Sequence, residues 1–265
     1  MASNVLVRNN VKEKLARGEV VASMTVRLVR QAEIAQIVAT AGFDTLYVDM
    51  EHSAATFEAT SQICMAALAA GIAPFVRVPA NTAEYIARVL DGGALGVIAP
   101  HVNSAAEALA VVAAAKFPPL GARSAPGALP QLQFRSVPVA DAYAALNAAT
   151  MIIVQFETEQ ALKHADAIAS VEGIDMVMIG SNDLLAEWGM PEQYEHPRLR
   201  EAYATTIAVC RRHGKHVGVG GLANRPKLVA DFVRMGARYV STGTDLAFLL
   251  GACAERARQV TQIAP

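Results

Sequence analysis

Chemically reactive side chains follow four apolar runs of this chain, at the point where each run ends. The first run ends in the stretch 47–52, YVDMEH, which contains two carboxylates and an imidazole. Three later runs end in the same way, with Arg77, Glu157 and Asp183. Burying a charge is costly unless the charge is paired, so charge at the end of an apolar strand needs a reason. The ends of parallel strands in a barrel meet at one rim, where we expect these groups to lie together.

Glu157 and Asp183 admit two interpretations. Both follow an apolar run and precede a helical pattern, where carboxylates commonly stabilise the first turn of a helix. Adjacent strands of a barrel would also bring the two carboxylates together. Such a pair suits a hard divalent cation, Mg²⁺, Mn²⁺ or Co²⁺, that keeps water and substrate oxygens as its other ligands. The spacing alone leaves both interpretations open.

Arg77 and His52 also have a structural and a chemical interpretation. Arg77 would either form an ion pair with a rim carboxylate or stabilise negative charge on a substrate oxygen beside a metal. His52 would either complete a turn or act as a general acid or base, since imidazole titrates near neutrality. In the second case Asp49 or another carboxylate would orient it. We expect His101, after the fourth run, to be part of a pocket wall rather than a catalyst.

The elements that must position these groups are eight short Val- and Ile-rich runs that alternate with longer helical patterns. This alternation is typical of βα units around a parallel sheet. The sequence therefore predicts a single-domain (β/α)8 TIM barrel over residues 1–265. The expected strands lie near 20–26, 45–50, 73–78, 95–100, 151–156, 176–179, 216–219 and 239–242.

One long irregular segment, from Phe117 to about Val139, interrupts this alternation and is rich in Pro and Gly. Loops of this length inside a domain are usually functional or disordered. The segment follows the fourth helix, so we expect it on the helix-to-strand side of the barrel unless it folds back over a neighbour. A contribution to the active site of a partner subunit is one possible use.

Composition excludes several classes of function. The chain has 53% hydrophobic residues, a net charge of −1 and a pI of about 6.6, with basic residues scattered rather than clustered, so nucleic acid is not an expected partner. The apolar runs are broken well short of the roughly 20 residues of a membrane span. Cys64, Cys210 and Cys253 show neither metal-ligand spacing nor an even count, which favours a reducing compartment. We expect a cytoplasmic protein that acts on a small molecule.

The motifs together resemble the HpcH/HpaI aldolase family, metal-dependent class II pyruvate aldolases that include the 4-hydroxy-2-oxoheptanedioate aldolases. The resemblance runs from about Leu15 to Arg258. It rests on AGFDTLYVDMEHS, FVRVP, PPLGARS, QFETEQA, VEGIDMVMIGSNDL and GARYVSTGTDLAFLL. It implies reversible cleavage of a 4-hydroxy-2-oxo acid to pyruvate and an aldehyde through a pyruvate enolate, a role suited to the catabolism of aromatic compounds.

The same resemblance implies a role for each site residue. Glu157 and Asp183 match the metal ligands, Arg77 the enolate-stabilising arginine and His52 the catalytic histidine. Asp49 matches an acidic residue near that histidine. The remaining matches are Asp91 in VLDGG, a carboxylate that pairs with the histidine from a neighbouring subunit, and a substrate-binding set of Arg77, Gln155, Ser181, Asn182 and Asp183, in which backbone amides of Asn182 and Asp183 hold the substrate carboxylate.

Two positions depart from the family pattern. Ser124 stands where Gly often follows the arginine of PPxGxR, and Ser181 stands in place of Pro in GPxDL. Ser181 keeps the amides of the turn available, so we expect carboxylate binding to persist. The substrate-side loop differs more, which leaves the identity of the aldehyde open.

A covalent mechanism is not expected, because a Schiff-base aldolase needs a lysine at the rim. None of the lysines, Lys12, Lys14, Lys116, Lys163, Lys215 and Lys227, follows an expected strand. Two other functions remain alternatives. An acyl-CoA-type carbon–carbon lyase of the same barrel group would need a cationic groove, and a non-catalytic ligand-binding barrel would have little need for the charged rim.

The last helical pattern, 246–262, carries an apolar set that is wide enough to pack against another element. In a monomer it would close the barrel as the eighth helix. The resemblance implies instead that this helix is exchanged with a neighbouring subunit in a hexamer built from trimers.

Overall fold

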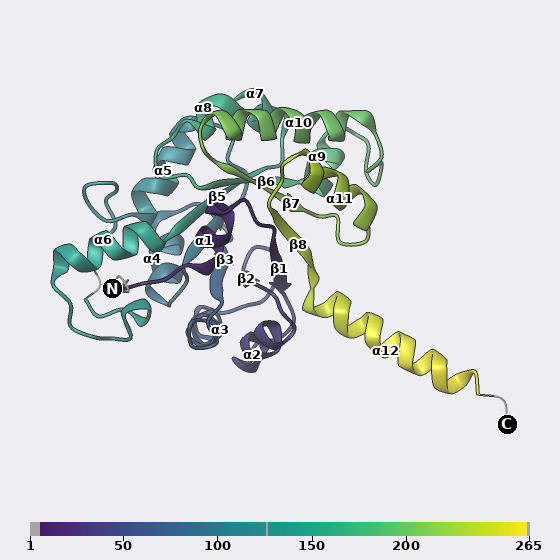
Figure 1. The fold of residues 1–265 in the computed structure, drawn as a ribbon, viewed down its shortest axis with the longest axis horizontal. Helices are drawn as coiled ribbons and strands as arrows, with labels where there is room; N and C mark the ends of the chain where they lie inside the picture. The colour runs from purple at the N-terminus through teal and green to yellow at the C-terminus, as the bar shows by residue number, and fades with distance from the viewer. Residues whose placement is uncertain (1–5, 126, 264–265) are drawn as a thin grey trace.

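Eight short apolar runs form a closed parallel barrel in the computed structural model, which describes residues 6–125 and 127–263 (Figure 1). The strands pair in sequence order, and β8 closes the barrel against β1. The strands are Val21–Val26 (β1), Thr45–Asp49 (β2), Ala73–Arg77 (β3), Gly96–Ala99 (β4), Met151–Phe156 (β5), Met176–Gly180 (β6), His216–Gly220 (β7) and Tyr239–Thr244 (β8). All eight expected strands are confirmed, with bounds within two residues of the prediction.

Helices alternate with the strands and surround most of the barrel (Figure 1). They are Asn10–Ala16 (α1), Glu33–Thr40 (α2), Phe57–Ala69 (α3), Ala83–Asp91 (α4), Ala105–Ala115 (α5), Val139–Ala149 (α6), Glu159–Lys163 (α7), Ala165–Ala169 (α8), Ser181–Glu187 (α9), Pro197–Arg212 (α10), Pro226–Met235 (α11) and Asp245–Thr261 (α12). None of the described helices has both the length and the apolar character of a membrane span.

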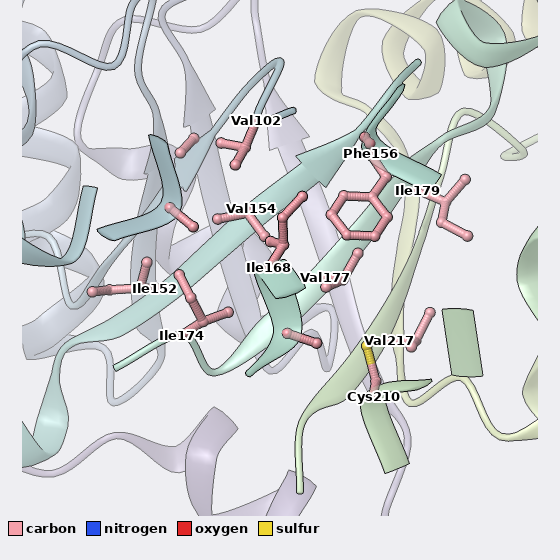
Figure 2. Close-up of a cluster of buried hydrophobic side chains, with 14 of the residues drawn as sticks. Val102, Ile152, Val154, Phe156, Ile168, Ile174, Val177, Ile179, Cys210 and Val217 are labelled. Atoms are coloured by element: carbon pink, nitrogen blue, oxygen red, sulfur yellow. The ribbon is translucent and has the colours of Figure 1, made fainter. Parts of the chain in front are cut away.

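The core between the sheet and the helices is apolar. Figure 2 shows Val154 and Phe156 of β5 and Val177 and Ile179 of β6 among these side chains, with Ile168 of α8 beside them. All five are fully buried. Burial on both faces of the strands explains why the sequence shows continuous Val and Ile runs instead of alternation.

The irregular segment after α5 closes the amino-terminal end of the barrel. Leu129 and Leu132 are buried against residues of α1, α6 and the barrel interior. Gln131 donates to the carbonyls of Leu90 and Ala94, at 2.6 and 2.9 Å. The described part of this segment therefore lies on the helix-to-strand side of its own barrel, as expected, and not over the carboxyl ends of the strands.

The final helix, α12, leaves the barrel instead of covering it, as Figure 1 shows in yellow. It follows β8 directly and contacts mainly β1 and β8. Several of its large apolar side chains are exposed: Leu246, Phe248, Leu249, Leu250 and Val260. The alternative in which this helix packs on its own barrel as the eighth helix therefore does not hold in this conformation, and its exchange between subunits stays a prediction.

Candidate active site

Asp49, the last residue of β2, lies at the centre of a buried network of charges. Its side chain is fully buried and accepts hydrogen bonds from Arg77 Nε at 2.9 Å and Nη2 at 2.6 Å. Arg27 Nε, beyond the end of β1, donates to Asp49 Oδ2 at 2.6 Å. Parallel register explains the first contact, because Asp49 and Arg77 are direct partners in the β2–β3 ladder.

The paired charges shift the pKa of both partners. Burial alone would raise the pKa of Asp49, but the hydrogen bonds and charge of Arg77, followed by the charge of Arg27, outweigh it and hold the pKa below its usual value. Burial would likewise lower the pKa of Arg77, yet Asp49 raises it well above its usual value. Arg77 is therefore a permanently charged guanidinium in a fixed orientation.

His52 lies at the rim with an exposed imidazole, and Asp49 contacts it through the backbone only. The His52 N–H donates to Asp49 Oδ1 at 3.2 Å, so this carboxylate fixes the turn. The imidazole Nε2 lies 3.6 Å from Glu51 Oε2 instead. Glu51, and not Asp49, is therefore the carboxylate beside the His52 ring.

Glu51 and His101 are two site residues whose importance the sequence did not reveal. Glu51 Oε2 forms an ion pair with Arg77 Nη1 at 2.9 Å. His101 Nε2 lies 3.1 Å from Glu51 Oε1, and its Nδ1 lies 3.1 Å from Glu157 Oε2. His101 adopts a left-handed backbone conformation, φ 52°, which is uncommon for a residue with a side chain. His101 is therefore more than part of a pocket wall, because its imidazole connects Glu51 to Glu157.

Glu157, directly after β5, is buried and surrounded by polar groups. Its Oε1 accepts from Gln155 Nε2 at 3.0 Å and its Oε2 accepts from the His101 backbone N–H at 2.9 Å. Burial raises the pKa of Glu157, and the charges of Asp183 and Glu51 add to that increase against the lowering effect of His101. The carboxylate is thus placed where a nearby positive charge would stabilise its ionised form.

The donor set around Glu157 fits a hard divalent cation. Gln155 Oε1 is buried without a hydrogen-bond partner, beside the carboxylate of Glu157. Asp183, in the first turn of α9, lines the same cavity and adds a second carboxylate. No group of three or more His, Cys, Asp or Glu side chains with metal-binding geometry occurs in the described ranges, so water and substrate would complete the coordination.

A cavity of about 230 Å³ lies at the carboxyl ends of the strands, and Asp49, Glu51 and His101 are not part of its lining. The sequence-predicted residues His52, Arg77, Gln155, Glu157 and Asp183 all border it. Arg27, Tyr47, Met178, Gly180, Ser181, Asn182, Gly220 and Gly221 complete the lining. None of the lysines borders it, and all of them lie in the described ranges. The arrangement can hold an oxyanion between a fixed guanidinium and a cation, beside an exposed imidazole.

The side chains of two expected substrate-binding residues have partners within the protein, while the expected role of the backbone amides of this turn stays a prediction. Ser181 is fully buried and its Oγ lies 3.0 Å from the Tyr203 hydroxyl, so the side chain is used in the core. Asn182 is exposed, and its Oδ1 accepts from the Tyr194 hydroxyl at 2.9 Å. The sequence gives no local indication of these contacts, because Tyr203 and Tyr194 belong to later segments of the chain than Ser181 and Asn182.

Asp91 is not part of this cluster. It is the last residue of α4, and its Oδ1 accepts from Arg123 Nη2 at 2.5 Å. The Arg123 guanidinium in turn stacks on the Phe117 ring, 4.6 Å from its centroid. Within one chain Asp91 therefore anchors the long segment, and its pairing with a histidine across subunits stays a prediction.

Residues 24–252 match the family model described as HpcH/HpaI aldolase/citrate lyase. A 4-hydroxy-4-methyl-2-oxoglutarate aldolase from Hapsidospora irregularis is 39% identical over 226 residues, which cover 84% of this chain and 84% of that protein. The 2-keto-3-deoxy-L-rhamnonate aldolase of Escherichia coli (strain K12) is 34% identical over 242 residues, with 91% and 89% covered.

The fold agrees with a solved structure of the same group. The crystal structure of an HpcH/HpaI aldolase from Desulfitobacterium hafniense DCB-2 superimposes with a TM-score of 0.90. The two are 32% identical, and the match covers 96% of this chain and 97% of that chain.

Proposed function

The chain belongs to the HpcH/HpaI aldolase/citrate lyase family, and from this premise we propose that the cavity of about 230 Å³ is its active site. The protein is an aldolase, a carbon–carbon lyase that cleaves a 2-oxo acid to pyruvate and an aldehyde. The observation that carries the assignment of the site is the convergence of Arg77, His52, Glu157 and Asp183 on one cavity. A non-catalytic barrel is set aside by the same family membership.

Glu157 and Asp183 would hold a divalent cation, with Gln155 beside them. When bound, the cation supplies Lewis-acid stabilisation of the negative charge that develops on the oxygen at C2 of the substrate. Glu157 is buried, and burial together with the charges of Asp183 and Glu51 raises its pKa, so a bound cation would stabilise its ionised form.

Arg77 would stabilise the same developing charge with its guanidinium. Asp49 and Glu51 hold its guanidinium, so no reorganisation is needed when the charge appears. Cleavage breaks the C3–C4 bond, and the electron pair becomes the C2–C3 double bond of the pyruvate enolate. The enolate then takes a proton at C3.

His52 is the group we assign to the proton of the C4 hydroxyl. Its imidazole is exposed at the rim and lies beside Glu51, which can orient it. Removal of this proton turns the C4 carbon into the carbonyl of the departing product. His101 holds Glu51 and Glu157 at a fixed separation and is a positioning residue in this scheme.

The outward α12 supports a proposal on assembly. A helix that projects from the barrel with Leu249 at 53% and Leu250 at 64% exposure is unfavourable for a free monomer in water. We propose that α12 packs on a neighbouring copy of the chain, in the hexamer that the sequence led us to expect. The pairing of Asp91 with His52 across subunits would follow from that assembly.

Chelation tests the proposed site directly. Pyruvate release from a 4-hydroxy-2-oxo acid should stop after exhaustive treatment with EDTA and return with Mg²⁺, Mn²⁺ or Co²⁺. Glu157→Gln and Asp183→Asn should each weaken Mn²⁺ binding in a direct titration, while Glu159→Gln, on α7 and outside the cavity, should not. Full activity without metal, or a borohydride-trapped imine, would refute the assignment.

A further inference from the structure

A second cavity, of about 440 Å³, adjoins the first across the ends of β7, β8 and β1. The two cavities share four residues, Arg27, Tyr47, Asn182 and Gly221. None of the roles assigned above uses this second space. A substrate that is cleaved between C3 and C4 extends beyond the atoms that become pyruvate, so the space beside the first cavity is available for its other half.

The floor of the second cavity carries hydroxyl groups. Thr25 Oγ1 lies 3.1 Å from Ser241 Oγ, and the Tyr47 hydroxyl lies 3.4 Å from the same Ser241 atom. Thr25 and Tyr47 are nearly fully buried, so these hydroxyls have few alternative partners. A hydroxyl floor of this kind can donate to the oxygens of a bound ligand.

The walls carry two guanidinium groups and one carboxylate. Arg27 donates through Nε to Asp49, which leaves the rest of its fork at the boundary of the two cavities. Arg225, in the loop between β7 and α11, lies over the Tyr194 ring at 5.0 Å from its centroid. Glu192 is the carboxylate in the lining. Arg225 is exposed at this cavity and, within the described residues, forms no ion pair, so its charge is available to a ligand.

The loop that carries Arg225 is held in place by its neighbours. Tyr194, which stacks on the guanidinium, donates its hydroxyl to Asn182 at 2.9 Å. Asn182 in turn lies directly against Gly221, where an added Cβ would be 3.1 Å from its Cγ. Gly221 has φ 78°, a conformation that favours glycine. Arg225 is thus connected through Tyr194 to the wall that separates the two cavities.

On this basis, and resting on the proposed function, we propose that the second cavity binds the product half of the substrate and that Arg225 recognises a carboxylate on it. The preferred substrates are then 4-hydroxy-2-oxo acids with a second carboxylate beyond C4. In the synthetic direction the acceptor is a short aldehyde or ketone that carries a carboxylate, and the C3 carbanion of the enolate adds to its carbonyl carbon. The carbonyl oxygen takes the proton, and the acceptor carboxylate is unchanged.

The test compares charged and uncharged acceptors of similar size in aldol addition to pyruvate. Glyoxylate is paired with glycolaldehyde, and succinic semialdehyde with pentanal. The wild type should use each acid with a higher kcat/KM than its uncharged partner. In Arg225→Gln, kcat/KM should fall about 10- to 100-fold for the acids, the effect of losing a charge-assisted hydrogen bond, and change less than about 2-fold for the uncharged partners.

Controls separate this inference from the proposed function. Arg225→Lys should recover part of the preference, and Lys227→Gln, which removes a nearby charge outside the cavity lining, should retain all of it. Deuterium exchange at pyruvate C3 reports enolate formation without any acceptor and should be unchanged in Arg225→Gln. Equal use of acids and uncharged acceptors by the wild type, or loss of exchange in Arg225→Gln, would overturn the inference. Absence of exchange in the wild type would instead count against the proposed function.

Discussion

Asp49 is the residue on which the charged rim depends. Its fully buried carboxylate contacts two arginines, and its Oδ1 also accepts from the backbone of Glu51 and His52. A buried charge is stable only when such partners satisfy it, and removal of one partner leaves the others uncompensated. The network holds Arg77 in a fixed orientation, so that its guanidinium can stabilise negative charge on the substrate.

Substitutions of Arg77 and of His52 should have different effects on enolate formation. Arg77→Lys should reduce deuterium exchange at pyruvate C3 by about 100- to 1000-fold, because an ammonium cannot reproduce the fork that Asp49 and Glu51 hold. His52→Ala should retain most of the exchange and lose aldol cleavage, since His52 acts on the proton of the C4 hydroxyl. Nuclear magnetic resonance follows the exchange.

The control for this pair is Arg88→Lys, on the exposed surface of α4 where Arg88 stacks on Phe57. It should match the wild type in both assays. Equal exchange rates in Arg77→Lys and His52→Ala would contradict the division of roles.

Among the elements, β6 affects the proposed metal site because its end lies beside Glu157. Its last residue, Gly180, lies against the Glu157 side chain, and an added Cβ would be 2.6 Å from Glu157 Cγ. The close approach of neighbouring strand ends leaves no room for a side chain at this position. The α9 helix begins directly after it, which brings Asp183 to the cavity within one turn.

Gly180→Ala should therefore displace Glu157 and weaken the metal site. We expect Mn²⁺ affinity to fall by at least about 10-fold, a loss comparable to that from disturbing the support of a metal ligand. Titration with Mn²⁺ measures the affinity, and circular dichroism verifies the fold.

Gly218→Ala on the adjacent β7 is the matched control. Its added Cβ would meet Met176 Cε and Met178 Cγ at 3.3 Å, and these flexible side chains can move. A Gly180→Ala variant with unchanged metal affinity would show that Glu157 does not depend on this approach.

At the scale of the whole molecule, α12 is the helix with the most exposed apolar surface to account for. The helix carries apolar side chains along an exposed length, and the barrel beside it leaves Ile37 of α2 at 60% exposure. Both surfaces would be buried by exchange of α12 between copies of the chain. The catalytic rim would then form in an assembly, where the long segment of one subunit can approach the site of another.

Light scattering after gel filtration tests the assembly. The wild type should elute with the mass of six chains, and Leu250→Glu should dissociate it because a carboxylate would replace a side chain that the proposed interface buries. Activity should fall with the dissociation. Gln259→Glu adds the same charge at another exposed position of α12 and should leave the mass and the activity near those of the wild type. A fully active wild-type monomer would refute the assembly.

The sequence by itself determined the barrel and the positions that carry charge at its rim. Buried parallel strands need continuous apolar runs and surface helices need a helical period, so local composition predicted all eight strands. The residues after these strands, from His52 to Asp183, were identified for the same reason: a charge that follows a buried run is conspicuous in the chain itself.

The tertiary structure alone decided which of these charges meet. Glu51 and His101 are 50 positions apart, yet they join at the rim because the β2 and β4 ends converge there. Arg225 reaches the second cavity through a loop, and α12 turns away from the barrel although its pattern suits a covering helix. Side-chain contacts across the rim depend on register, backbone conformation and packing between distant segments. The periodicity of the sequence predicts none of these.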